Sequence, residues 1–389
     1  MLPPRVWLVC SGLEHARRGY ESFARECFDQ LREEPGVSIE LIKGSGAPGR
    51  DERVSTALRR DRRTAQLLGR ARGVPPFRIE ALSFGVALAP SLRRRAPEVV
   101  YLSEWDTARA LARLRPLLRG RYRLLLCNGG FAAAGFDHLD HVQELTPAAR
   151  EHVLAHGADP ERHTVLPLGF AIDGELRPVS PEERAALRER LHLPAARPVV
   201  LSLAALNRSH KRLDYLIDEL AQLPAPRPFL LLAGEPDAQT PSVRALALER
   251  LGPNGFDMRT VAAAEVAALC RASDVFVLAS LAEMQGRALV EAAAHGTPCL
   301  AHDSPVMRFA VGEYGEYGDF ARPGELARLL ARQLAKSPAA LHAQAQAAHR
   351  HVHERFSWER LRPRYVELLR SVARANSTVS SSTGEKLPR

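Results

Sequence analysis

The stretch "DVFVLASLAEMQGRALVEAAAHGTPCLA", residues 274–301, decides the fold of this chain. It opens with the apolar run "DVFVLAS", which is typical of a buried strand and ends at Ser280. A loop, "LAEMQ", leads to Gly286, where the helix "GRALVEAAAHG" can begin, and a second apolar run, "PCLAHDS", follows. A strand, a helix and a further strand in this order predict a βαβ unit of a parallel sheet.

The same alternation extends through most of the chain. Apolar runs typical of buried strands recur before and after the opening stretch, as in "RVWLVCS", "VSIELIK", "EVVYLS", "YRLLLCN", "DHVQELT", "PVVLSLAAL" and "PFLLLAGEP". A length of 389 residues is too great for one compact core and suits two domains. The sequence therefore predicts an α/β fold of two Rossmann-like, doubly wound domains in tandem.

Proline and glycine clusters indicate where these domains end. We expect an N-terminal domain over residues 1–170, an interdomain linker over 171–195 and a C-terminal domain over 196–352. Residues 353–375 contain the amphipathic pattern "FSWERLRPRYVELLRSVA" and predict a terminal helix. The remaining residues, 376–389, are polar and low in apolar content, which predicts a disordered tail.

Composition excludes several classes of protein. Apolar residues make up 46% and charged residues 25%, which is typical of a globular chain, and no apolar run reaches membrane-spanning length. The N-terminal run "VWLVC" lacks a small-residue cleavage site and is interpreted as a strand, not as a signal peptide. Five scattered cysteines without CxxC spacing favour a reducing compartment without disulfides or zinc. Without an Asp-x-Asp pair or HExxH motif, we expect no tightly bound catalytic metal.

The net charge is +9, and the basic excess is larger in residues 1–170 than in the rest of the chain. Such an excess fits an anionic acceptor, an anionic membrane or nucleic acid, and arginine enrichment from a GC-rich genome is the alternative. The basic stretch 59–72 is interpreted either as a solvated helix face or as a segment touching anionic lipid or acceptor. Because it has no aromatic residues for stacking on bases, nucleic-acid binding is not expected.

Two glycine-rich or basic motifs follow predicted strands. "GSGAPG", residues 44–49, matches a dinucleotide-binding pattern but carries a proline at its fifth position, so we interpret it as a surface loop. "NRSHKRLDYLI" places Arg208, His210, Lys211 and Arg212 after a strand and before a helix, at the edge of the sheet where ligands bind. Cations beside helix N–H groups form an anion site, and a surface cluster at a helix start is the alternative.

Two carboxylates of the opening stretch have different expected positions. Glu283 lies in the loop before the helix, whereas Glu291 lies in its second turn. The N–H groups of Arg287, Ala288 and Leu289 point toward any anion at the helix start. A diphosphate flanked by two hydroxyl-bearing sugars fits this arrangement, because carboxylates accept from hydroxyls and phosphate needs donors. The spacing E-x7-E also occurs by chance, so an ordinary polar helix start is the alternative.

The order of these motifs resembles that of retaining GT-B glycosyltransferases of family 4, the glycosyltransferases group 1. The resemblance rests on "NRSHKRLDYLI", "LLLAGEP", "RASDVFVLAS" and "EMQGRALVEAAAHGTPCLA", followed by a late "FSWERL" helix. "VLPLGFAID" is similar to the family's interdomain segment, and "RRGYESFARECFDQL" to its glycine-containing loop and first helix. The resemblance extends to about residue 372. It implies two Rossmann-like domains facing across a cleft, with the terminal helix crossing back to the N-terminal domain.

The resemblance also implies roles for donor-binding residues. Glu283 would face the transferred sugar, and Glu291 would bind the ribose hydroxyls. Arg208 and Lys211 would neutralise the leaving diphosphate, and the backbone from Gly286 to Leu289 would hold phosphate and sugar. Members often carry an arginine five residues before the lysine, where this chain has Leu206, so the role of Arg208 is less secure than that of Lys211.

On the acceptor side the resemblance implies Gly19, Tyr20 and Glu21. Many members have a histidine after the strand that here reads "LLLCNGG", and Asn128 occupies that region of this chain. Two histidines, His138 and His141, follow further on, and neither is assigned the family histidine's role.

The expected activity is transfer of a sugar from a nucleotide diphosphate sugar to an acceptor hydroxyl with retention of configuration. The acceptor would be a polysaccharide, a glycolipid or a natural product, and no metal would be required. The enzyme alternatives are a GT-B sugar-nucleotide epimerase or a phosphorylase, and the non-enzyme alternative is a nucleotide-sugar-binding scaffold without turnover. We expect a cytoplasmic protein, with peripheral contact at the inner face of an anionic membrane as an open alternative, and no nucleic-acid partner.

Overall fold

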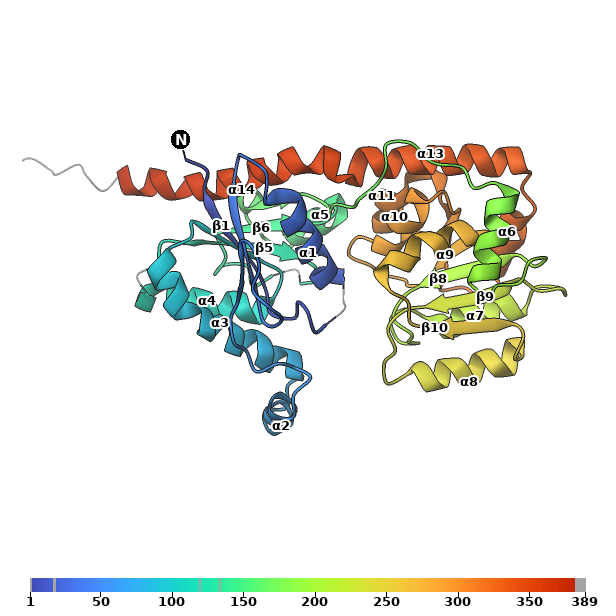
Figure 1. Ribbon diagram of the computed structural model, residues 1–389, viewed down its shortest axis with the longest axis horizontal. Helices are drawn as coiled ribbons and strands as arrows, with labels where there is room; N and C mark the ends of the chain where they lie inside the picture. Colours follow the sequence, from blue (N-terminus) through green and yellow to red (C-terminus); the bar gives the residue numbers. More distant parts are fainter. Residues whose placement is uncertain (1, 17–18, 119, 133, 382–389) are drawn as a thin grey trace, which may run out of the picture. The chain divides into compact units, whose positions relative to one another are not determined.

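The computed structural model describes residues 2–16, 19–118, 120–132 and 134–381, and side chains up to residue 375. The chain forms two compact units, each described by itself. The first contains Met1–Gly169 and Trp358–Arg389, and the second contains Phe170–Ser357 (Figure 1). The first unit is therefore built from both ends of the chain.

The first unit is a parallel sheet between helices. Its strands are β1 (Arg5–Cys10), β2 (Ser38–Lys43), β3 (Glu52–Val54), β4 (Val99–Leu102), β5 (Arg123–Asn128), β6 (His141–Glu144) and β7 (His163–Val165). Its helices are α1 (Gly19–Leu31), α2 (Arg63–Arg72), α3 (Pro76–Arg95), α4 (Trp105–Leu118), α5 (Pro147–Ala155), the 3-10 turn η1 (Pro160–Arg162) and α14 (Trp358–Ser381). The strand order is β3-β2-β1-β4-β5-β6-β7, and the order reverses between β1 and β4.

Helix α14 is bound to the first unit by aromatic packing. Trp358 stacks on Phe23, and the Tyr365 hydroxyl donates to the Pro167 carbonyl at 2.9 Å. Gly169 is required beside Trp358, because a Cβ there would lie 2.5 Å from the indole ring. Burying such large rings explains why the last helix belongs to the first unit. The helix continues to Ser381, into the stretch 376–389 predicted to be disordered, and the residues after 381 lie outside the described part.

The second unit repeats the architecture. Its strands are β8 (Val199–Leu203), β9 (Phe229–Ala233), β10 (Phe256–Arg259), β11 (Val275–Leu278), β12 (Cys299–His302) and β13 (Glu316–Gly318). Its helices are α6 (Pro181–Arg190), α7 (Leu213–Ala221), α8 (Thr240–Leu251), α9 (Val266–Ala272), α10 (Arg287–Ala294), α11 (Pro305–Val311), α12 (Glu325–Leu334) and α13 (Pro338–Phe356), with 3-10 turns η2 (Ala263–Glu265) and η3 (Gly312–Tyr314). The parallel order β10-β9-β8-β11-β12-β13 reverses between β8 and β11.

The two sheets confirm the predicted fold class of two doubly wound α/β domains. The stretch 171–195, expected as a linker, is instead part of the second unit and contains α6. Arg188 of α6 is buried, donates to the Ala272 carbonyl at 3.0 Å and pairs with Asp274 at 2.5 Å. The His349 ring lies 3.0 Å from the Asp173 carbonyl. These contacts join residues far apart in sequence, so local composition alone could not reveal them.

Candidate functional site

The candidate site lies in the second unit, where β8 and β11 end and the strand order reverses. In open α/β sheets this edge is where ligands bind, because the connecting helices leave on opposite faces. The loop from β8 to α7 carries Lys211, and the loop from β11 to α10 carries Glu283. The two expected side chains are thus brought to one edge by neighbouring strands.

Lys211 and Glu283 form a direct ion pair between the lysine Nζ and the carboxylate Oε1. Their side chains are 17% and 14% exposed, so the pair is mostly shielded yet reachable from solvent. A cation that can be shared between a carboxylate and an incoming anion is suited to binding phosphate next to a sugar hydroxyl. The structure therefore brings together the two residues expected to act on the reacting end of a donor.

Asn207 shapes the lysine-bearing loop and was not expected from the sequence. Its side-chain oxygen accepts from the N–H of Lys211 at 2.9 Å and from that of His210 at 3.3 Å. Its own side chain is buried, so these bonds fix the loop in one conformation. The preference of Asn for bonding nearby backbone N–H groups is the sequence signal that could have identified it.

The other cations of this loop have partners elsewhere. Arg208 is exposed, its Nε lies 3.3 Å from the Asp214 carboxylate, and its backbone N–H donates to Gln239 at 2.8 Å. Arg212 donates to the Phe320 carbonyl at 2.7 Å and lies over the Tyr215 ring. Because exposed pairs of this kind are weak, Arg208 could exchange Asp214 for a ligand, whereas Arg212 serves to fix the start of α7.

Gly286 directly precedes α10 and adopts the left-handed conformation, at φ 71° and ψ 47°. Only glycine adopts this conformation without a steric cost, and it ends the loop so that α10 starts directly beside Glu283. The Leu289 N–H already donates to the Gly286 carbonyl at 2.9 Å, and the buried Leu289 side chain packs in the core. An anion at this helix end would therefore use the backbone before Leu289, from Gly286 to Ala288, together with the helix dipole.

Arg287 and Glu291 form the other end of the expected donor site. The Arg287 guanidinium lies 4.5 Å from the centre of the Phe170 ring, and its Nη2 is 3.5 Å from Glu291 Oε1. Glu291 is about one-third exposed and lies one turn into α10. This position places a hydroxyl-accepting carboxylate away from Glu283, on the helix and not on the loop.

Two buried hydroxyls at this edge make no hydrogen bond within the described part of the chain. They are the Oγ atoms of Ser202, near the end of β8, and Ser280, directly after β11. Both side chains are almost fully buried, with Ser280 at 0% exposure. A buried hydroxyl without a partner costs free energy, so this edge is less completely satisfied than an ordinary protein interior.

The expected acceptor-side residues all lie in the first unit, where many of their polar groups have internal partners. The Tyr20 hydroxyl donates to the Val9 carbonyl at 3.2 Å, and burial raises the pKa of Tyr20 well above its usual value. Asn128 is buried at the end of β5 and donates to Glu144 at 2.9 Å. Glu21 is buried with its carboxylate 3.6 Å from Arg60, and Gly19 is exposed at the start of α1.

A buried ionic cluster lies where β1 and β4 end, and no motif of the sequence indicated it. Glu80 is fully buried and accepts from Arg60 Nη2 at 2.7 Å, from the Arg60 backbone N–H at 2.5 Å and from Ser11 at 3.0 Å. His15 Nε2 contacts the same carboxylate at 2.9 Å. Burial acts to raise the pKa of Glu80, but the bonds from Arg60 and His15 outweigh it and hold the pKa below its usual value.

Glu104 belongs to the same cluster but behaves differently. Burial raises its pKa despite bonds from Ser11 and Thr107. Its Oε2 lies 2.7 Å from the Thr107 hydroxyl, which also lies 3.0 Å from the Ala81 carbonyl. The cluster thus pairs an ionised Glu80 with a carboxyl that favours its neutral form.

His138 and His141, the two histidines that follow β5, both have a pKa below the usual histidine value. Burial, together with His163 and Arg162, lowers the pKa of His141 to about 4, and its Nε2 lies 2.9 Å from the Thr164 hydroxyl. Burial also lowers the pKa of His138. Both rings are therefore neutral at pH 7 and are available as hydrogen-bonding groups only.

Three further histidines, His349, His351 and His353, alternate along α13 in a spacing used by metal sites on strands. On a helix, residues two positions apart do not face each other, and both ring nitrogens of His349 contact backbone carbonyls. Across the described ranges, no three His, Cys, Asp or Glu side chains are grouped closely enough to hold a metal ion. The same ranges contain no helix that is long and apolar enough to cross a bilayer.

The chain is similar in sequence to curated glycosyltransferases. Residues 197–336 match the family model described as glycosyl transferases group 1. D-inositol 3-phosphate glycosyltransferase of Rhodococcus opacus is 30% identical over 259 residues, 64% of this chain and 56% of that protein. Mannosylfructose-phosphate synthase of Agrobacterium fabrum is 30% identical over 195 residues, 47% of this chain and 42% of that protein. The chain thus spans about half the length of the curated relatives it matches.

Solved structures match over nearly the whole chain. Anabaena HepE in complex with UDP and glucose has a TM-score of 0.74 at 17% identity, covering 95% of this chain and 100% of that one. Sucrose-phosphate synthase from Thermosynechococcus elongatus has a TM-score of 0.75 at 19% identity, covering 96% and 100%. At such low identity the likeness shows the fold alone, and that fold is the expected pair of Rossmann-like domains.

Proposed function

We propose that this chain, whose residues 197–336 match the glycosyl transferases group 1 family model, transfers a sugar from a nucleotide diphosphate sugar to an acceptor hydroxyl with retention of configuration. The observation that carries the proposal is the Lys211–Glu283 pair beside the glycine-led start of α10. A lysine, a carboxylate and a helix N-terminus at one sheet edge supply the groups that a sugar diphosphate needs.

The proposed donor spans the edge from Glu283 to Glu291. The diphosphate would bind the backbone from Gly286 to Ala288 and the Lys211 ammonium, with Arg208 reaching it from the rim. Glu291 would accept from the ribose hydroxyls, beside Arg287. UDP-glucose is the first donor to test, because the structurally similar HepE has been crystallised with UDP-glucose.

In the proposed reaction the acceptor oxygen forms a bond to the anomeric carbon as the bond from that carbon to the diphosphate oxygen breaks. The acceptor's proton goes to the departing phosphate oxygen on the same face, which retains the configuration. Lys211 and the N-terminal end of α10 stabilise the negative charge that develops on the diphosphate. This cationic edge could serve in place of a metal ion.

Glu283 would hold the transferred sugar by accepting from its hydroxyls, near the 3-hydroxyl. Its pairing with Lys211 orients the carboxylate before the donor arrives. When a diphosphate binds, the lysine would contact both anions. The pair therefore couples sugar binding to phosphate binding through one ammonium group.

The acceptor is proposed to be a sugar, a lipid-linked molecule or a small molecule that binds through Gly19, Tyr20, Glu21 and Asn128. We further infer a cytoplasmic protein that works at or near an anionic membrane. All five cysteines are buried and free, which suits a reducing compartment, and the basic excess lies in residues 1–170. His138 and His141 are not assigned a catalytic role.

The first experiment is a thermal-shift screen against UDP-, GDP-, ADP- and dTDP-sugars, followed by turnover with the donor that binds. Specific binding raises the unfolding temperature in proportion to the logarithm of ligand excess over its dissociation constant. Lys211→Ala and Glu283→Ala are each expected to reduce turnover by about 10²- to 10³-fold, as removal of a charge-stabilising group does. Lys336→Ala, which breaks a similar Lys–Glu pair with Glu316, is the matched control and should retain wild-type turnover.

The product decides between the proposed reaction and its alternatives. Inversion at the anomeric carbon would reject the retaining assignment, and wild-type turnover in both site variants would reject the site. Conversion of the sugar nucleotide without acceptor would indicate an epimerase, and a requirement for inorganic phosphate would indicate a phosphorylase. Donor binding without transfer or hydrolysis would indicate a scaffold.

A further inference from the structure

Helix α2 of the first unit is held by small residues and presents nearly all its side chains to solvent. It packs on α3, and only Ala65 and Gly69 are buried within it. A Cβ on Gly69 would lie 2.7 Å from the Val74 carbonyl, so the helix lies directly against the start of α3. Gly73 ends the helix in the left-handed conformation. Figure 1 shows α2 at the outer end of the helices that cover this side of the first unit. The helix is therefore a fixed and protruding element.

The solvent face of α2 combines an exposed leucine with arginines. Leu67 is 62% exposed, the highest value of the large apolar side chains in this helix. Arg63 and Arg70 lie four positions before it and three after it, so they flank Leu67 on the same face. Leu68, 40% exposed, and Arg72 continue the face on one side. We call these five residues the basic apolar face.

The arginines of this face lack acidic partners. Arg62, Arg63, Arg70 and Arg72 are exposed and make no ion pair within the described ranges. No aspartate or glutamate occurs between residues 62 and 78, whereas the preceding Arg59 is paired with Asp61. Arg63 lies in the first turn of α2, where a cation opposes the helix dipole, whereas Arg70 and Arg72 lie in the last turn, where the dipole favours a cation.

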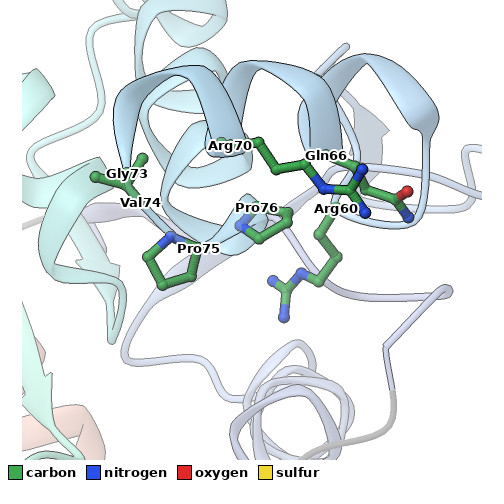
Figure 2. Close-up of a pocket in the computed structure, with 8 residues that line it drawn as sticks. Arg60, Gln66, Arg70, Gly73, Val74, Pro75 and Pro76 are labelled. Atoms are coloured by element: carbon green, nitrogen blue, oxygen red, sulfur yellow. The ribbon is translucent and has the colours of Figure 1, made fainter.

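A hollow of about 650 Å³ lies beside the helix, between α2 and the start of α3. Figure 2 shows it lined by Arg60, Gln66 and Arg70, with Pro75 and Pro76 among the other lining residues. Arg60 is neutralised by Glu80, while Arg70 keeps its charge available. The hollow thus offers hydrogen-bond donors next to the basic apolar face.

We propose that the basic apolar face of α2 binds the surface of an anionic lipid bilayer, with Leu67 inserted among the lipids and Arg63, Arg70 and Arg72 contacting phosphate headgroups. Charge complementarity and the exposed leucines select this partner. A single-stranded nucleic acid would need aromatic side chains for stacking, and α2 has none. The inference deepens the proposed membrane contact by naming the helix that makes it, and its test requires neither the donor site nor turnover, so it can fail while the proposed sugar transfer stands.

The expected size follows from the electrostatics of membrane surfaces. Each arginine near an anionic surface changes the partition coefficient by about fivefold. Removing three arginines should therefore lower binding by at least tenfold, and by about 100-fold if the contributions add. Replacing Leu67 should weaken binding even in high salt, since the apolar part of binding is not screened by ions.

The test is flotation of the full-length protein with vesicles, without donor or acceptor. Vesicles of phosphatidylcholine are compared with vesicles in which about one third of the lipid is phosphatidylglycerol. The variant Arg63→Ser/Arg70→Ser/Arg72→Ser is compared with Arg93→Ser/Arg94→Ser/Arg95→Ser, which removes the same charge from the exposed last turn of α3. Leu67→Ser is measured in low and high salt, and unfolding temperatures confirm that each variant is folded.

We expect the wild-type protein to float with anionic vesicles only. The partition coefficient onto these vesicles should fall at least tenfold in the α2 triple variant and change by less than about threefold in the α3 triple variant. Equal binding to both kinds of vesicle would overturn the proposal. Equal losses in both triple variants would overturn it as well, because binding would then depend on net charge alone. An unchanged Leu67→Ser variant, or tighter α2-dependent binding to a short single-stranded DNA than to vesicles, would also contradict it.

Discussion

The two units share a topology, yet the edges at which their strand orders reverse are built in opposite ways. In the first unit the edge between β1 and β4 is closed by Glu80, whose carboxylate is surrounded by Arg60, His15 and Ser11. In the second unit the edge between β8 and β11 carries the Lys211–Glu283 pair, within reach of solvent. The same backbone arrangement thus supports one saturated edge and one that retains capacity for a ligand.

The difference shows what distinguishes a binding edge from a structural one. A buried carboxylate surrounded by donors has no capacity left for a ligand, and removing it leaves charges unpaired in a low-dielectric environment. The buried hydroxyls of Ser202 and Ser280 lack partners in the described part of the chain, and Gly286 directly precedes α10 on the loop that follows Ser280. Incomplete satisfaction is tolerated where a ligand supplies the missing contacts.

The largest effect is expected from removing Glu80, the carboxylate at the centre of the saturated edge between β1 and β4. Glu80→Ala should lower the free energy of unfolding by about 3–5 kcal/mol, because it removes a fully buried carboxylate and leaves Arg60 and the buried His15 ring without their shared partner. Glu283→Ala should change it by only about 1 kcal/mol or less, because the Glu283 carboxylate, unlike that of Glu80, is itself partly exposed to solvent. Urea unfolding of both variants measures the contrast, and equal losses would show that the two edges do not differ in this way.

An intermediate effect concerns the glycine at the open edge. Gly286→Ala should lower donor affinity by about fivefold to thirtyfold, since a Cβ in the left-handed region costs about 1–2 kcal/mol and the helix start must shift. Gly73→Ala is the matched control, because Gly73 ends α2 with a similar φ of 63° and nothing lies within 4 Å of its Cβ position. Donor titration of both variants should show lost affinity in Gly286→Ala alone, although both lose stability.

The smallest effect is a pH dependence within the saturated edge. Burial raises the pKa of Glu104 in the folded protein, so its neutral form favours folding, and that contribution is lost as pH rises through the folded pKa. Glu104→Gln keeps a neutral group of similar shape and should gain stability relative to wild type as pH rises from about 4 to about 8. Calorimetric unfolding at several pH values measures the difference, and a difference independent of pH would show that folding does not raise the pKa of Glu104.

The sequence predicted Lys211, Glu283 and Gly286 together because their order along the chain follows from strand, loop and helix. It could not predict that Arg208 lies beside Asp214, since which cation faces a ligand depends on how the loop turns at Asn207. It also missed Glu80, which lies inside α3 and resembles an ordinary polar helical residue in the sequence. The prediction of a linker over residues 171–195 was wrong for a related reason. Contacts such as that of Arg188 with Asp274 join residues that are distant in sequence, and they make this stretch part of the second unit.

The sequence by itself determined the two α/β units, the strands that carry the open edge and the residues that follow those strands, because hydrophobic periodicity and turn chemistry are local properties. Only the tertiary structure decided which polar groups are saturated and which remain available. It placed the buried side chains of His15 and Glu80 against the partly buried Arg60, and it left the carboxylate of Glu283 partly exposed beside Lys211. The physical reason is that burial and pairing depend on neighbours brought together by folding, and those neighbours decide where a ligand can bind.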